Sequence, residues 1–469
     1  MKRNRGFSER FILLFKAILP SPLSIALILT LLTFGLALVF AEHQNQGLLD
    51  RTLQFAKFWE KGLWGMDLID GHWKRSWQLP FLVQMMLMLV LGYILAMSKP
   101  FNSLIKHLTK YCNTTAQAAF IISFFTILVS LFNWGLGLVL GAIFARKVAE
   151  YATANKIAMH YGLIGAAGYS GMLVWHGGLS GSAPIKAAEP GSLANMISNN
   201  KVSEIGLDQT IFSSMNLFVS FLVITALPLT FYWLGKKRKG KLLDVHPHDK
   251  TSKFNTGLFG AEKLDHSGIF STIIGGLFIL YCIYIAFIKP TELSLAFLTP
   301  DFINLSLFGL AFIFHQNIIA FLRSLDHAIG SSSGILIQFP FYFGILGIMK
   351  YSGLMTEMSG FFVSISNKST FAINTLLSAG IVNIFVPSGG GQWAVQGPII
   401  LSAAQELNLS IPKSIMAIAY GDQLTNMLQP FWALPLLGIT GLKPKAIIPF
   451  TLVLMLVGLI IFTLGLLLF

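Results

Sequence analysis

Residues 383–393 have the sequence NIFVPSGGGQW, which places Pro387, Ser388 and three glycines between two amides in a strongly apolar part of the chain. Glycine and proline break a helix, and hydrocarbon offers a broken backbone no hydrogen-bond partner. Such a stretch persists at membrane depth only where protein surrounds it or where it lines a wet cavity. The sequence therefore predicts a polar break that holds a solute, the alternative being a helix kink at a packing contact.

The composition indicates a protein with many membrane spans. Of the 469 residues, 54% are hydrophobic and only 11% are charged, whereas soluble domains have roughly 25% charged residues. Seven apolar runs approach the roughly 20 residues that cross a bilayer. They cover residues 22–40, 81–97, 211–234, 269–288, 302–314, 335–349 and 447–468. We therefore expect an all-α polytopic membrane protein.

The net charge of +13 is distributed in the way that sets membrane topology. Basic residues cluster at residues 2–16, before the first apolar run, and at residues 236–241, after the run that ends at residue 234. Because positive residues stay on the cytoplasmic side, we expect both clusters there, with residues 1–21 as a cytoplasmic N-terminal segment. The run at residues 22–40 exceeds the about 7 to 15 apolar residues of a secretory signal, so we expect an uncleaved span. No nucleic-acid partner is expected.

The two halves of the chain show weak internal symmetry around a basic loop at residues 235–266. Five residue pairs recur in the same order at an offset of 250 to 252 residues: Gly92 and Gly344, Met97 and Met349, Asn133 and Asn383, Tyr169 and Tyr420, Pro184 and Pro435. Transporters are often built from such repeats. We therefore expect a first repeat at residues 22–234, a connecting span at residues 267–300 and a second repeat at residues 301–469.

The order of the runs predicts that the repeats are inverted and that each contains a re-entrant helical hairpin. Residues 116–147 are interrupted near Asn133 and end in a basic pair, so this hairpin is expected to open to the cytoplasm. The hairpin at residues 370–404 is then expected to open outward. Broken transmembrane helices are expected beside the hairpins, and residues 302–321 are expected to return as one span.

The hairpin tips are the predicted binding site for an anion. One half-helix begins at each tip with free amides and about half a positive charge, which suits a carboxylate without any arginine. Gln338 and nearby aromatic residues such as Phe339, Phe431 and Trp432 can enclose a short acyl tail, although membrane aromatics usually serve packing. The predicted substrate-binding residues are Asn133, Gly135, Gly137, Ser180, Ser182, Gln338, Ser388, Gly389, Gly390, Gly391, Gln392 and Trp393.

A coupling ion is expected near Asp422, because an ionisable residue inside a membrane segment is a functional candidate by default. The predicted coupling residues are Asn133, Asn383, Asp422 and Asn426. In the alternative reading, Asp422 caps the second half of a broken helix. His176 is left outside the predicted site, since a lone histidine is usually a satisfied polar residue. Neither a cofactor nor a bound metal is expected, apart from a transported sodium ion.

Two other functional classes share some of these features. A channel also uses broken helices and polar backbone to select its ions. The motif GxSG occurs twice and is typical of intramembrane serine proteases, with His160 or His176 as a base for Ser170 or Ser180. A serine nucleophile needs its base within hydrogen-bond reach, and a second repeat has no purpose in such an enzyme. We therefore expect a carrier and no enzyme.

Five stretches of this chain strongly resemble the bacterial short-chain fatty acid transporter family of the AtoE type. They are residues 133–141 (NWGLGLVLG), 335–342 (ILIQFPFY), 383–398 (NIFVPSGGGQWAVQGP), 414–421 (SIMAIAYG) and 429–435 (QPFWALP). The resemblance covers nearly the whole chain. It implies a secondary carrier of the bacterial inner membrane that imports small monocarboxylates, such as acetoacetate or butyrate, by cation-coupled alternating access.

The same family is similar to a wider ion-transporter superfamily, which implies inverted repeats, paired hairpins, elevator-type movement and a homodimer. Dicarboxylate carriers of that superfamily often have Ser-Asn-Thr at their hairpin tips, and this chain does not. Sodium coordination therefore does not transfer motif for motif, and either sodium or a proton remains the expected coupling ion.

Overall fold

The computed structural model describes residues 21–41, 47–69, 71–75, 78–189, 192–193, 204–246, 260–290, 297 and 299–469. Within these ranges, six helices are long and apolar enough to cross a membrane, or seven spans if one bent helix pair counts as a span. The six are α2 (Pro22–Phe40), α4 (Gln78–Met97), α6 (Thr115–Phe132), α10 (Ser214–Lys236), α12 (Gly268–Ile283, continued by a π turn at Tyr284–Ile288) and α21 (Pro444–Leu468). The predicted helical multi-span membrane protein is confirmed. Most of the N-terminal segment and part of the basic loop lie outside the described residues.

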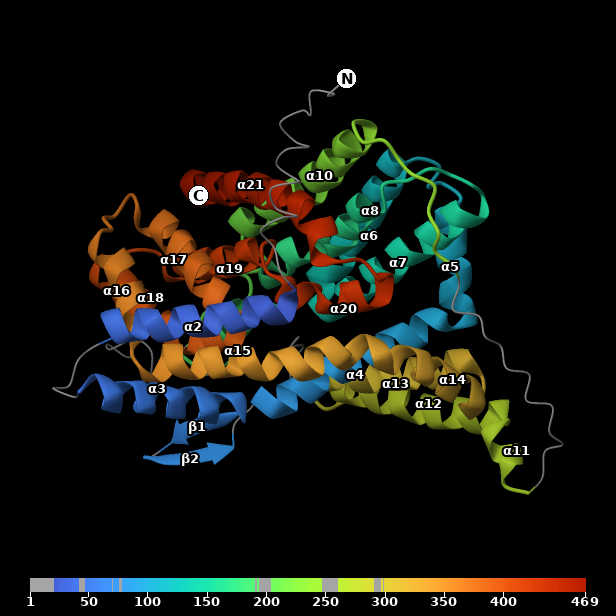
Figure 1. Ribbon diagram of the computed structural model, residues 1–469, viewed down its shortest axis with the longest axis horizontal. Helices are drawn as coiled ribbons and strands as arrows, with labels where there is room; N and C mark the ends of the chain where they lie inside the picture. Colours follow the sequence, from blue (N-terminus) through green and yellow to red (C-terminus); the bar gives the residue numbers. More distant parts are fainter. Residues whose placement is uncertain are drawn as a thin grey trace.

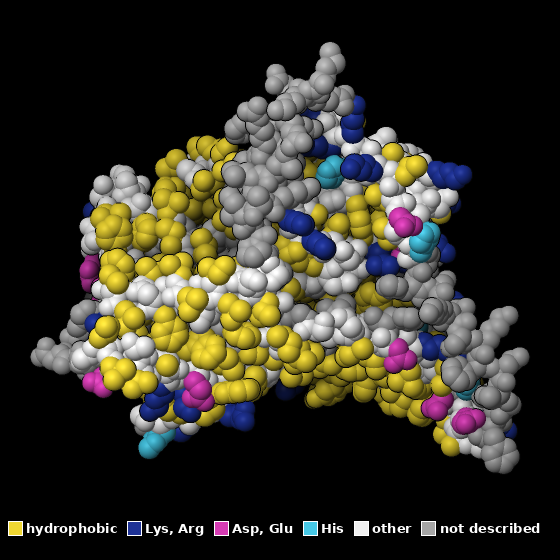
Figure 2. Space-filling model, viewed as in Figure 1, with side chains coloured by type: hydrophobic (Ala, Val, Ile, Leu, Met, Phe, Trp, Pro, Cys, Tyr) yellow, Lys and Arg dark blue, Asp and Glu magenta, His cyan; other side chains and the backbone are white. Residues whose placement is uncertain are grey.

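Seven helices form an elongated layer along one side of the molecule, which we call the lower layer (Figure 1). It contains α2, α3 (Leu48–Leu63), α4, α12, α13 (Pro300–His315), α14 (Ile318–Ile329) and α15 (Ser333–Tyr351). Hydrophobic side chains cover much of this face, whereas Lys and Arg gather toward its edges (Figure 2). Exposed apolar residues such as Leu31 and Ile269 belong to this surface, as expected for helices that face lipid.

The lower layer also contains a departure from the predicted all-α fold. Strands β1 (Met66–Ile69) and β2 (His72–Arg75) form an antiparallel hairpin in which Met66 pairs with Arg75. The Asp67 carboxylate accepts a hydrogen bond from the Tyr351 hydroxyl and lies 3.0 Å from Lys350 Nζ. These contacts hold the hairpin against the end of α15. The strands are too short to show an alternating sequence pattern, and the tertiary contacts of Asp67 stabilise them instead.

Glycines allow α3 and α15 to approach closely. A Cβ atom added to Gly347 would lie 2.4 Å from the Phe58 carbonyl oxygen. We expect Gly347→Ala to lower the apparent melting temperature of the purified protein in detergent, because overpacking costs about 1–3 kcal/mol. Gly360→Ala is the matched control, since Gly360 is also helical and its added Cβ atom would have no atom within 4 Å. Equal melting temperatures for both variants would contradict this close packing.

The remaining large helices form a second body above this layer, which we call the upper body (Figure 1). Its first half contains α6, α7 (Trp134–Ala154), α8 (Tyr161–Tyr169), two 3-10 turns (Ser170–Leu173 and Trp175–Gly177), α9 (Ser182–Ala187) and α10. Its second half contains α17 (Phe371–Phe385), α18 (Gly389–Glu406), α19 (Ile411–Thr425), α20 (Pro430–Thr440) and α21. The shorter helices α5 (Lys99–Thr109), α11 (Glu262–Asp265) and α16 (Leu354–Ser364) and a 3-10 turn at Gly330–Ser332 complete the described elements.

Both halves follow one order of elements. A long helix (α4 or α15) precedes a short one (α5 or α16), then a helix pair, a broken helical segment and a long final helix. The members of each helix pair fold back on one another. Gly137 of α7 lies against Ser130 of α6, and the Gln392 amide of α18 donates to the Ala379 carbonyl of α17 at 2.9 Å. Each half therefore contains a helical hairpin beside a broken helix.

The helix pair α13 and α14 differs from the sequence prediction. Residues 302–321 were expected to form one span, but the chain bends by 116° between these helices. Gln316 adopts a left-handed conformation with φ of 65°, and the Asn317 side chain accepts a hydrogen bond from the Ala320 amide at 2.7 Å. An asparagine in this position caps a new helix, so the segment that was predicted as one span is sharply bent in its middle.

Candidate functional site

The tip of the second hairpin lies directly on the broken segment of the first half. A Cβ atom added to Gly389 would lie 2.9 Å from His176 Cε1, 3.0 Å from Trp175 Cη2 and 3.1 Å from Ser182 Oγ. Only glycine fits there without displacing these neighbours. The structure thus brings together two predicted site residues, Gly389 and Ser182, that are far apart in sequence, and it adds Trp175 and His176 to them.

The amides at this tip remain available to a ligand. Ser388 caps α18, since its hydroxyl accepts a hydrogen bond from the Gly391 amide at 3.2 Å. The amides of Gly389 and Gly390 have no acceptor within the described chain. Gly390 is exposed, and a Cβ atom there would meet nothing within 4 Å. Two free amides at the positive end of an 18-residue helix are a suitable site for an anion.

Asp422 and His176 form a buried pair between the two halves of the chain. Asp422 is 1% exposed and His176 is fully buried. The His176 Nδ1 atom lies 3.3 Å from Asp422 Oδ1, a polar contact whose geometry falls short of a hydrogen bond. The Ala183 amide donates to His176 Nε2 at 2.9 Å. Nε2 is therefore unprotonated, so the ring's proton is on Nδ1, the atom nearest to Asp422.

The second carboxylate oxygen of Asp422 is buried and has no hydrogen-bond partner in the described residues. Asp422 lies inside α19, and Gln429 is at the cap position of α20. Asp422 therefore does not cap the second half of the broken helix, which was the structural alternative for this residue. An unpaired buried carboxylate is costly, and a cation bound beside it removes that cost.

An amide cluster connects this pair to the first arm of the second hairpin. Asn383 Nδ2 donates to the Asp422 carbonyl at 2.7 Å, to Thr425 Oγ1 at 3.0 Å and to Asn426 Oδ1 at 2.8 Å. The Tyr169 hydroxyl donates to the Asn426 carbonyl at 2.8 Å. Three of the four predicted coupling residues are therefore neighbours. Asn133, the fourth, belongs to the other hairpin.

The tip of the first hairpin is filled by protein. Asn133 caps α7 by accepting from the Leu136 amide, and the Trp134 amide donates to Ser180 Oγ at 3.0 Å. A Cβ atom added to Gly135 would lie 1.7 Å from Met88 Sδ. These residues therefore leave only the Gly135 amide of the first turn without an acceptor in the described chain, and they allow close helix packing. The two tips, expected to be equivalent, differ, and only the second presents free amides next to an ionisable residue.

Three further predicted residues have contacts elsewhere. Gln392 donates to Ala379 and Gln396, so its amide holds the arms of the hairpin together. Trp393 packs in an apolar cluster that includes residues of α9 and α19. Gln338 lies in α15, and its Oε1 atom is buried without a partner among the described residues. The structure does not bring these side chains to the free amides of the second tip.

Several contributing residues were not singled out from the sequence. The Trp175 ring stacks on His176 with centroids 4.4 Å apart, and Gln423 Oε1 accepts from the His176 amide at 2.9 Å. Gln429 donates to the Asn383 carbonyl. The two glutamines stand out as polar residues in an apolar segment, which is a usable signal. Nothing local marks Trp175 as part of the site, because its contacts with Gly389 and Trp432 come from the other half of the chain.

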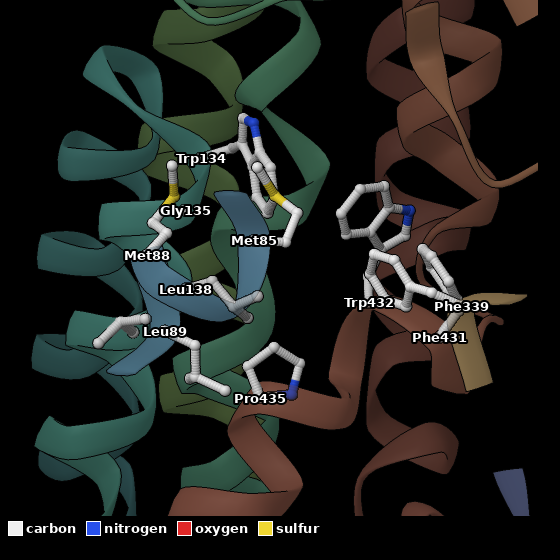
Figure 3. Close-up of a pocket in the computed structure, with 11 residues that line it drawn as sticks. Met85, Met88, Leu89, Trp134, Gly135, Leu138, Phe339, Phe431, Trp432 and Pro435 are labelled. Atoms are coloured by element: carbon white, nitrogen blue, oxygen red, sulfur yellow. The ribbon is translucent and has the colours of Figure 1, made fainter. Parts of the chain in front are cut away.

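An apolar cavity lies beside this site, between α4 and α15 of the lower layer and α7 and α20 of the upper body. Figure 3 shows Met85, Trp134 and Leu138 on one side of it and Trp432, Phe431 and Phe339 on the other. Its volume is about 20 Å³, which admits a water-sized group. The Trp134 and Trp432 rings are 4.9 Å apart, so aromatic walls enclose the cavity.

Neither a metal centre nor a serine nucleophile is assembled in the described part of the chain. No group of three or more His, Cys, Asp and Glu side chains lies close enough there to hold a metal ion. Ser170 Oγ contacts Ser123 and the Ala167 carbonyl, and both ring nitrogens of His176 face other partners. The base that a protease would need is therefore not next to Ser170.

Comparisons with known proteins agree over the full length of the chain. A family model described as "Short chain fatty acid transporter" matches residues 5–469. Proteins of Escherichia coli strain K12 and Haemophilus influenzae, both named "Putative short-chain fatty acid transporter", are 35% identical over 463 and 458 residues, and each alignment covers 96% of both chains. A solved structure, the YdaH transporter of Alcanivorax borkumensis, has 15% identity and a TM-score of 0.45 and covers 95% of this chain and 97% of its own.

Proposed function

We propose that this chain, which belongs to the short-chain fatty acid transporter family and is no enzyme, imports small monocarboxylates across the bacterial inner membrane by cation-coupled alternating access. The observation that carries this proposal is the contact between a hairpin tip with free amides and the buried pair His176–Asp422. This contact brings the proposed anion site at the hairpin tip next to the proposed cation site at Asp422. Both halves of the chain contribute residues to it.

The substrate carboxylate binds at the second hairpin tip. The free amides of Gly389 and Gly390 point the positive end of α18 at it, and the Ser182 hydroxyl lies beside the same tip. Backbone amides bind a carboxylate without an arginine, and a substrate held in this way is released easily. The tip is therefore suited to a small anion that is carried across and let go.

The cation binds at Asp422 and makes substrate binding conditional on its presence. Without a cation, the Asp422 carboxylate and the substrate carboxylate repel each other across His176, because charges in a poorly solvated interior are weakly screened. A proton or a sodium ion at the unpaired oxygen of Asp422 removes that repulsion. Asn383, which donates to the Asp422 carbonyl, and Asn426, which accepts from Asn383, orient the site. Cation and substrate then favour each other's binding, which is the definition of coupling.

The transport movement is a displacement of the upper body against the lower layer. The repeated order of elements supports two inverted repeats with re-entrant hairpins, and the family resemblance supports an elevator-type movement and a homodimer. Lys236, at the end of α10, begins the basic cluster, which supports a cytoplasmic location for the N-terminus and for this end of α10. Cross-linking of introduced cysteine pairs across α4 and α7 will test the movement, since both native cysteines are buried.

Uptake into proteoliposomes tests the proposed function directly. Purified protein will be supplied with labelled acetate, butyrate or acetoacetate under an imposed sodium gradient or proton gradient. We expect saturable uptake that one of the two gradients drives and that unlabelled substrate on the opposite side accelerates. Such acceleration is the property of a carrier, whereas a channel gives flux that does not saturate and shows no exchange. Absence of uptake in both gradients would overturn the proposal.

A further inference from the structure

The apolar cavity between the lower layer and the upper body has walls that suit hydrocarbon. Met85 and Met88 of α4, Trp134 and Leu138 of α7, and Phe431 of α20 contribute apolar or aromatic surface to it. A carboxylate placed there would lose its hydration without finding a charged partner, whereas a methyl or methylene group gains free energy from leaving water. The cavity is therefore suited to the tail of a small acid and not to its head group.

The Trp175 ring connects this cavity to the hairpin tip. On one side, Trp175 Cη2 lies 3.0 Å from the position of a Cβ atom on Gly389. On the other side, the ring centroid lies 6.1 Å from that of Trp134 and 6.3 Å from that of Trp432, two residues that line the cavity. Trp175 therefore lies between the hairpin tip and the cavity and packs against residues of both.

Tight aromatic contacts form one wall of the cavity, and this wall limits the length of that tail. The Phe339 and Phe431 rings stack with centroids 4.1 Å apart, and Tyr342 packs edge-on against Phe431 at 4.6 Å. Rings held in this way do not move aside without losing their mutual contacts. A volume of about 20 Å³ admits a group the size of one water molecule. A longer chain would have to displace the wall.

We propose that this cavity receives the distal end of the acyl chain and thereby sets the upper limit of chain length. The inference rests on the proposed function, since it presumes that a monocarboxylate binds at the second tip. It goes beyond that function by assigning chain-length selection to Met88, Leu89 and Gly135, residues that do not contact the carboxylate site.

Two substitutions change the cavity in opposite directions. Met88→Ala removes a side chain from the wall and enlarges it. Gly135→Ala introduces a Cβ atom 1.7 Å from the present position of Met88 Sδ, so this flexible side chain has to shift, and the added methyl narrows the space. Leu89→Ala is a second enlarging variant on the same helix. Leu95→Ala is the matched control, because Leu95 is equally buried on α4 but lines a separate apolar cavity of about 320 Å³.

The experiment measures initial uptake of labelled acetate, butyrate and hexanoate by each variant in proteoliposomes, after gel filtration has shown that the protein is monodisperse. We expect Met88→Ala and Leu89→Ala to raise the ratio of hexanoate to acetate uptake about tenfold, the factor for burying about two further methylenes. We expect Gly135→Ala to lower the ratio of butyrate to acetate about fourfold, the factor for one methylene. Leu95→Ala should keep the wild-type ratios.

The outcomes separate this inference from the proposed function. Wild-type ratios in all three cavity variants, with acid uptake intact, would overturn the assignment of the cavity and leave the proposed function standing. Changed ratios in Leu95→Ala of the same size would also overturn it, because the effect would then not belong to this cavity. Absence of acid uptake by the wild-type protein would overturn the proposed function and the inference with it.

Discussion

Asp422→Asn is expected to abolish gradient-driven uptake while exchange of substrate across the membrane continues. Asparagine has nearly the shape of the carboxyl group but no charge, so the variant resembles the carrier with its cation already bound. It can bind substrate and move, but it can no longer take up or release the cation. We expect the gradient-driven initial rate to fall at least about tenfold, equivalent to losing about 1.4 kcal/mol of coupling free energy.

The measurement compares gradient-driven uptake with exchange in vesicles that contain unlabelled substrate on both sides. Asp326→Asn, on the exposed surface of α14, is the control for removal of one negative charge from the protein. Because Asp422 has one polar contact with a fully buried histidine, His176→Gln should weaken coupling in the same assay. Coupled uptake at the wild-type rate in Asp422→Asn would exclude this carboxylate as the cation site.

Gly389→Ala is expected to reduce transport at least about tenfold, equivalent to about 1.4 kcal/mol. Its methyl group would meet His176, Trp175 and Ser182 at 2.9 to 3.1 Å. The nearest of these neighbours cannot withdraw freely, because His176 accepts from the Ala183 amide and is stacked on Trp175. The hairpin tip must therefore move away from the broken segment, and the anion site separates from the cation site.

Gly390→Ala is a closely matched control for the contact with His176, since it adds the same methyl one residue later, where no protein atom lies within 4 Å, and it keeps the backbone amide. Both changes replace glycine in the first turn of α18, so their effects on helix propensity are similar. The two variants should be compared for uptake and for elution as a single species on gel filtration. Similar uptake by both variants would show that the contact of Gly389 with His176 has no part in transport.

The breaks of the hairpins were predictable from the sequence because helix capping is a local property. Asn133 and Ser388 both precede a helix and accept a hydrogen bond from the amide three residues later, which their residue types favour. The apolar runs likewise predicted the approximate position of five of the six long apolar helices, whereas the sixth, α6, was predicted as an arm of the first hairpin. The bend at Asn317 has the same local signal, and it was missed because the apolar run around it suggested continuity.

The partners across the two halves could not be predicted in the same way. His176 and Asp422 are 246 positions apart in the sequence, and no periodicity relates their two segments. A single histidine is more often a structural residue than a functional one, and only the position of its neighbour shows which it is. Trp393 was predicted as a binding residue because it lies next to the glycines in sequence. Its side chain instead packs against α9 and α19. Proximity along the chain was therefore a poor guide to proximity at the site.

The short apolar helices have a consequence for biogenesis. Helix α17 has 15 residues and α20 has 11, lengths of about 22 Å and 16 Å, which fall short of the roughly 30 Å hydrocarbon core. Neither can settle in lipid alone, and α20 packs against α7 of the first half. The ribosome adds about 5–20 residues per second, so it completes α20 tens of seconds after α7. During that interval, α7 has to remain in the membrane without the helix that packs against it in the finished structure.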